Sequence, residues 1–262
     1  MNTFADDQLR VFRYPLFLFL VSFFTLWLSA WIGASRFKRF RVEAAEWQDD
    51  FGVIQGATLT LLGLIIGFTF SMALGRYDQR KNFEEEEANA IGTEYVRADV
   101  LPAADAAKVR ALLLSYLDQR VLFYTARDEQ KLEQINTETS RLQAQLWSAV
   151  VAPASAQPTP LMALAVAGMN DVLNSQGYTQ AAWWNRIPIA AWALMMAIAI
   201  CSTMLVGIGA GTGKGNSRLL VVLPLVVSIA FFLIADIDSP RRGVIRVIPQ
   251  NLLSLSQSLR AQ

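Results

Sequence analysis

Apolar residues gather in four long segments of the chain. Asp, Glu, Lys and Arg are absent from residues 14–35, 51–75, 187–213 and 219–235. A helix that crosses the hydrocarbon core of a bilayer, roughly 30 Å thick, needs about 20 mostly apolar residues. The first three segments meet this length, and the fourth meets it when Arg218 and Asp236 extend their polar ends to the headgroup layer. We therefore expect four spanning helices, at about residues 14–35, 51–75, 187–210 and 218–236.

The polar segment between the second and third spans, residues 76–186, is long enough to form a domain. Apolar residues recur in it at steps of three and four, the period of one helical face. We expect helices at about residues 76–101, 103–126, 128–151 and 161–180, the first of them continuing the second span. Pro153, Pro158 and Pro160 predict a loop after the third of these helices.

The expected fold is therefore all-α and membrane-embedded, with two transmembrane hairpins. Residues 1–75 form the first hairpin, residues 76–186 a helical extramembrane segment, and residues 187–262 the second hairpin with a C-terminal tail. Trp183 and Trp184 precede the third span, where indole rings favour the headgroup layer.

Lys and Arg flank the spans on both sides of the membrane. They are more numerous on the side of the two termini and of residues 76–186, which predicts that this side is cytoplasmic. The basic first loop, with Arg36, Lys38, Arg39 and Arg41, argues for the opposite orientation.

Composition excludes several function classes. Of 262 residues, 53% are hydrophobic and 17% are charged, and the net charge of +1 gives no field for nucleic acid. The chain has one cysteine and no histidine. Histidine-based zinc sites, nucleophile pairs and proton shuttles are therefore impossible, and we expect neither an enzyme nor a cofactor. A carboxylate site for calcium or magnesium remains open.

The second span carries a stripe of small residues along one helical side. Gly52, Thr60 and Gly75 extend a pattern whose centre is formed by Gly56, Gly63, Gly67 and Ser71. In lipid, glycines four apart let two helix backbones approach closely, so one interpretation is tight helix packing. The alternative is that this helix lines the axis of an oligomer, with Leu62, Ile66 and Phe70 forming a constriction that gates by dewetting.

No ionisable residue lies at mid-membrane depth in any expected span. Pumps and proton-coupled transporters commonly place such residues there, so the pattern favours a passive pore or a scaffold.

Two acidic clusters flank the spans. The first follows Arg76, Arg80 and Lys81 and consists of Glu84, Glu85, Glu86 and Glu87. Charges of opposite sign four residues apart are typical of a solvated, self-paired helix face, and the alternatives are a ring at a pore vestibule or a calcium site. The second cluster, Asp236 and Asp238, lies at the end of the last span, where Arg241 and Arg242 could form ion pairs with it. The alternative there is a metal or ligand site.

Several runs of residues carry a resemblance. They are Val53 to Gly56, Leu62 to Ala73, Arg76 to Asp78, Glu86 to Thr93, Asp99 to Pro102 and Asp236 to Val247. Together they resemble the bacterial bestrophin-like domain family, distant relatives of the bestrophins, although a calcium-clasp sequence is lacking. The resemblance implies a multi-pass protein of the bacterial inner membrane, assembled as a ring of identical subunits, because bestrophins are pentameric channels. It places the pore between Gln55 and Ser71, with a neck at Ile66 and Phe70.

Two functional hypotheses follow. The first is a homo-oligomeric passive ion channel, for anions by family analogy, whose partners are the lipid bilayer, further copies of the chain and inorganic ions. The second is a membrane-anchored scaffold or sensor whose helical segment binds a partner. An intramembrane enzyme is disfavoured, because the sequence offers no nucleophile and base pair.

Overall fold

The computed structural model describes residues 14–36, 48–210 and 220–261, and the regular structure within these ranges is helical. The chain divides into two compact units. Unit 1 comprises Met1–Gly75 and Arg186–Ile245, and unit 2 comprises Arg76–Asn185 and Arg246–Gln262. The end of the tail therefore belongs to the helical unit and not to the second hairpin.

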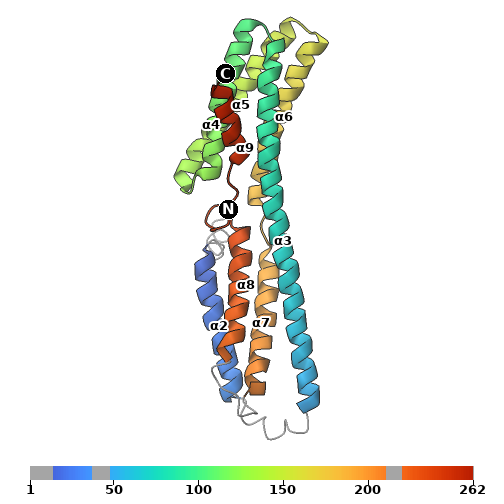
Figure 1. Cartoon of the computed structure of the whole chain (residues 1–262), viewed down its shortest axis with the longest axis vertical. Coiled ribbons are helices and arrows are strands. Elements are labelled where there is room, and N and C mark those ends of the chain that lie inside the picture. The colour runs from blue at the N-terminus through green and yellow to red at the C-terminus, as the bar shows by residue number, and fades with distance from the viewer. Residues whose placement is uncertain (1–13, 37–47, 211–219, 262) are drawn as a thin grey trace, which may run out of the picture. The chain divides into compact units, whose positions relative to one another are not determined.

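Unit 1 contains the apolar helices. These are α2 (Pro15–Arg36), the first half of α3 (Gln48–Arg97), α7 (Ile189–Ala210) and α8 (Val222–Asp238). In Figure 1, α2, α7 and α8 lie side by side. Among the described residues, three helical stretches are long and apolar enough to cross a membrane, within Pro15–Arg36, Asp50–Val100 and Pro160–Ala210. With 17 residues, α8 is shorter than these.

Helices α2 and α7 approach each other at glycines. A Cβ atom at Gly33 would overlap the backbone carbonyl of Met204, and one at Gly207 would overlap that of Ala30. The hydroxyl of Ser29 donates to the carbonyl of Ile200 at 2.9 Å. Small residues thus bring the two backbones into contact, the usual way for helices to associate where apolar burial gives little driving force.

Unit 2 is a helical bundle around an apolar core. The second half of α3 continues into the short helix η3 (Ala98–Val100), and the other members are α4 (Ala103–Thr125), α5 (Glu129–Ala156), α6 (Pro160–Trp184) and α9 (Gln250–Arg260). The predicted stripes face this core, with Leu113, Tyr116, Leu117 and Leu146 fully buried. Side-chain caps fix two helix starts. Asp128 accepts from the N–H of Lys131, and Thr159 accepts from the N–H of Met162.

Two local predictions were wrong. Pro153 does not end its helix, because it lies in the last turn of α5, where its missing N–H removes one hydrogen bond while its carbonyl accepts from Gln157. Trp183 is not a headgroup residue. Its indole is buried in unit 2, with ring centroids 5.0 Å from Phe123 and 5.4 Å from Tyr124. Trp184, the next residue, is exposed.

Candidate functional site

The membrane half of α3 has one side buried against its own chain. Leu62, Thr69 and Ala73 are buried, and they lie within an arc of about 40° on a helix that turns 100° per residue. Near its start, the side chains of Phe51 and Gln55 lie against Gly209 of α7. The rest of the helix surface in this half is largely open.

The small-residue stripe lies on the open side. Within the described part of the chain, a Cβ atom added at Gly52, Gly56, Gly63, Gly67 or Gly75 would meet no atom within 4 Å. Ser71 is also exposed. The stripe therefore does not pack against a helix of its own chain, and packing against another copy stays a prediction.

The four pore candidates lie within about 80° on one side of α3 but differ in exposure. Gln55 and Ile66 are half-buried, Phe70 is 39% exposed, and Leu62 is only 2% exposed. Because Leu62 is buried within unit 1, it is not on the face that an ion or a second copy could reach. This burial argues against Leu62 as part of a constriction, and the pore assignment of the other three candidates stays a prediction.

Residues that sequence reasoning missed occupy the open face instead. Leu64 is 52% exposed and Phe68 is 66% exposed, and with Thr60 they are spaced by four residues along α3. The span is apolar on all sides, so its sequence pattern alone could not separate Leu62 from Leu64. Only the burial of Leu62 in the folded chain makes the distinction.

The acidic cluster on α3 divides into two pairs. Glu85 and Glu86 are exposed, whereas Glu84 and Glu87 are buried inside unit 2. The carboxylate of Glu84 accepts from the N–H of Leu252 at 2.9 Å and from the side-chain amide of Asn251 at 2.7 Å, so it caps the start of α9. The prediction of a solvated, self-paired face was therefore wrong for Glu84 and Glu87.

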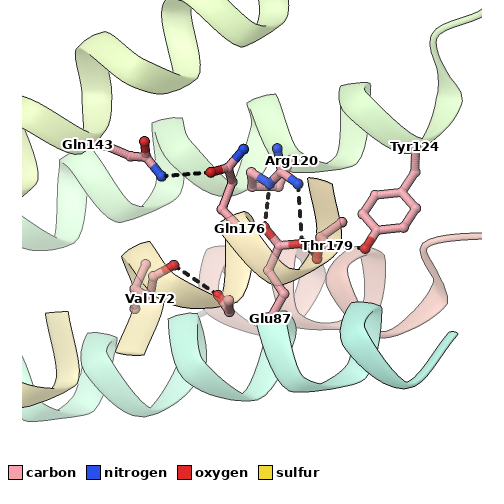
Figure 2. Close-up of polar contacts among 8 residues, drawn as sticks. Glu87, Arg120, Tyr124, Gln143, Val172, Gln176 and Thr179 are labelled. Carbon is pink, nitrogen blue, oxygen red and sulfur yellow. Dashed lines mark hydrogen bonds and ion pairs between the residues drawn. The ribbon is translucent and has the colours of Figure 1, made fainter. Parts of the chain in front are cut away.

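Glu87 is the centre of a buried polar network (Figure 2). Its carboxylate forms an ion pair with Arg120 of α4, and both side chains are fully buried. It also accepts from the hydroxyl of Thr179 at 3.2 Å and from that of Tyr124 at 3.4 Å. Figure 2 shows a second polar contact nearby, between the amides of Gln143 and Gln176 at 3.4 Å.

The pKa values of Tyr124 and Arg120 are shifted by their burial and by the charge of Glu87. Burial raises the pKa of Tyr124, and the negative charge of Glu87 raises it further. Burial, the largest single influence, would lower the pKa of Arg120, but the charge of Glu87, its hydrogen bond and the neighbouring tyrosines together outweigh burial and raise that pKa. Both groups are therefore locked in their usual protonation states, which is typical of a structural network and not of an acid or base.

Arg80, also predicted to be solvated, is buried at the end of α6. Its guanidinium donates to the carbonyls of Ala182 and Asn185, both at 3.2 Å. These carbonyls belong to the last turn of the helix and its cap, where a positive charge is favourable.

The C-terminal carboxylates bind backbone N–H groups. Asp236 accepts from Val244 at 2.7 Å and from Ile245 at 2.8 Å, and Asp238 accepts from Ile187 at 3.3 and 3.2 Å. Position 243 of this turn has no room for a side chain, because a Cβ atom at Gly243 would overlap the carbonyl of Asp236. Within the described ranges, no group of three or more His, Cys, Asp or Glu residues is arranged to hold a metal ion.

Comparisons with known proteins agree with this architecture. The sequence model of the Bestrophin-like domain matches residues 25–252. One variant of a bacterial Bestrophin homolog from Klebsiella pneumoniae superposes with a TM-score of 0.65 at 13% identity, covering 91% of this chain and 97% of that one. Another structure of that homolog gives a TM-score of 0.62 at 14% identity, covering 89% and 98%. At these identities the likeness shows the fold. No curated protein sequence matches the chain.

Proposed function

Because the chain belongs to the Bestrophin-like domain family, we propose that it is a homo-oligomeric, passive ion channel whose pore is lined by the membrane half of α3. Members of the bestrophin family are channels, and the apolar helices support a membrane protein. In the proposed topology, α8 is the fourth span, and both termini and unit 2 lie in the cytoplasm of a bacterial cell.

The observation that carries this proposal is the open face of α3. One side of the helix is buried on its own chain, while the glycine stripe and the large side chains of Leu64 and Phe68 have no covering helix among the described residues. A backbone exposed along glycines is suited to close contact with another helix in lipid. Further copies of the same chain are the simplest partners that could cover it symmetrically.

The exposure of side chains on α3 also changes which residues we place along the pore. We place Thr60, Leu64 and Phe68 on the pore side, at steps of four residues, with Leu64 and Phe68 as an apolar constriction that gates by dewetting. On a helix that turns 100° per residue, Ile66 and Phe70 lie more than about 100° from Leu64, so they are not part of this line, and Leu62 is left out because it is buried. This lining carries no charge, so the anion as permeant ion rests on the family alone.

Planar-bilayer recording of the purified protein tests the function. Wild type should conduct, and Phe68→Ala and Leu64→Ala should widen the constriction and raise single-channel conductance. Leu62→Ala is the matched control, because it removes the same side chain from the buried side of the same helix. Silence of intact oligomers in several lipids and at several voltages would contradict the proposal.

The second candidate is a membrane-anchored scaffold or sensor. It is favoured by an open groove of about 700 Å³ in unit 2, lined by Trp147, Pro158, Met162 and Val166 among others. Under this function the purified chain would not conduct.

A further inference from the structure

Glu94 is a buried carboxyl group without a hydrogen-bond partner. It lies on α3 within unit 2 and is 0% exposed. Neither carboxyl oxygen has a hydrogen-bond partner in the described part of the chain. The group faces α6 at Gly168, where an added Cβ would overlap both Glu94 Oε2 and Arg97 Nη1. The missing side chain at Gly168 therefore makes the space in which the carboxyl group is held.

Such a group is unstable as an anion. An ionised carboxylate in an apolar environment needs compensating partners, and without them it binds a proton instead. Burial accordingly raises the pKa of Glu94 to about 8, although the positive charge of Arg97 lowers it and the negative charge of Asp171 raises it again.

Other charged groups of the bundle are already engaged. Arg110 of α4 donates to the carbonyl of Tyr95 and pairs with Asp99. Glu87, two turns earlier on α3, is bound to Arg120. The charges that act on Glu94 are thus those of Arg97 on α3 and Asp171 on α6.

We propose that Glu94 is a proton-operated switch in the contact between α3 and α6, closed when the carboxyl group is neutral and loosened when it ionises. In the closed form, Arg97 Nη1 lies 3.9 Å from Asp171 Oδ2, and both side chains are partly exposed. Such a surface pair is weak, so it holds α3 and α6 together only loosely. An ionised Glu94 carboxylate draws water into the space beside Gly168, and the contact then loosens.

The sign of the pH effect follows from linkage. The pKa of Glu94 is higher in the closed form than the ordinary value of 4.5 that it has once exposed, so the closed form holds the proton more tightly. Stabilisation of the contact is complete below pH 4.5 and is lost progressively as pH rises through about 8. Rising pH therefore shifts the contact toward its loosened form, most steeply between pH 4.5 and about 8.

Hydrogen exchange of the full-length protein in detergent, followed by mass spectrometry between pH 6.5 and 9.5, tests this switch. After correction for the intrinsic effect of pH on exchange, protection of peptides that cover Glu94 and Gly168 should fall by up to about tenfold per pH unit and level off above pH 8. Glu94→Gln, which mimics the neutral carboxyl group, should remove this dependence. Glu86→Gln, an exposed neighbour on α3, should retain it.

A second variant tests the proposal with Glu94 left in place. Asp171→Asn removes the negative charge that raises the pKa of Glu94, so the midpoint of the transition should move to lower pH. Constant protection in wild type, an unchanged dependence in Glu94→Gln, or an unmoved midpoint in Asp171→Asn would overturn the proposal. Hydrogen exchange does not depend on ion conduction, so the proposal of a switch at Glu94 would stand even if the protein did not conduct ions.

Discussion

The carboxylate of Glu87 on α3 and the guanidinium of Arg120 on α4 form an ion pair in which both side chains are fully buried. The two residues are 33 positions apart in the chain, and the pair fixes how the two helices of unit 2 face each other. Thr179 of α6 donates to the same carboxylate, so three helices meet at one charged group.

Arg120→Ala should destabilise unit 2 strongly. It leaves the Glu87 carboxylate buried without its cation, a change that typically costs about 3–5 kcal/mol. The measurement is the unfolding midpoint of the purified chain in detergent. Glu138→Gln breaks an exposed ion pair with Arg141 and is the control, expected to leave the midpoint unchanged. Equal midpoints for the two variants would contradict the structural role of the buried pair.

Gly207→Ala should weaken the packing of α2 on α7. The new methyl group would overlap the carbonyl of Ala30, a backbone atom that cannot turn aside, and overpacking of this kind costs about 1–3 kcal/mol. Circular dichroism during heating in detergent measures the loss. Gly177→Ala is the matched control, because a Cβ there meets no atom of the described chain and Gly177 lies on α6, outside the stripe proposed to contact further copies. A Gly207→Ala protein as stable as Gly177→Ala would refute the close contact.

Asp236→Ala should loosen the turn after α8. The substitution leaves the backbone N–H groups of Val244 and Ile245 without their acceptor, and the loss of a typical intramolecular hydrogen bond costs about 0.5–1.5 kcal/mol. Limited proteolysis of the purified chain should then cut this turn faster than in wild type. Glu85→Ala, which removes an exposed carboxylate, should be cut at the wild-type rate. Unchanged proteolysis in Asp236→Ala would show that the turn holds without this carboxylate.

Helix positions could be predicted from the sequence because both signals are local. Uninterrupted apolar runs marked the helices of unit 1, and steps of three and four residues marked α4, α5 and α6. Arg120 also had a local signal, since it follows Tyr116 by four residues and Leu117 by three on the apolar face of α4.

The division of the acidic cluster could not be predicted in this way. Glu84 and Glu87 lie three residues apart, so a helix places them on the same side, but their partners lie on α9 and α4. No pattern near residue 84 in the sequence indicates that the C-terminal helix begins beside it. Leu62 and Leu64 differ for the same reason, because only the folded chain decides which side of an apolar helix is covered.

The central claim is that further copies of the chain cover the open face of α3. Its most direct test is cysteine crosslinking in membranes, in a Cys201→Ser background, with single cysteines at Leu62, Leu64, Gly67 or Phe68, followed by native mass spectrometry. We predict a closed ring that is crosslinked through Leu64→Cys, Gly67→Cys and Phe68→Cys, while Leu62→Cys stays unreactive. A monomer or a simple dimer, or crosslinking that is as efficient from Leu62→Cys, would contradict the account.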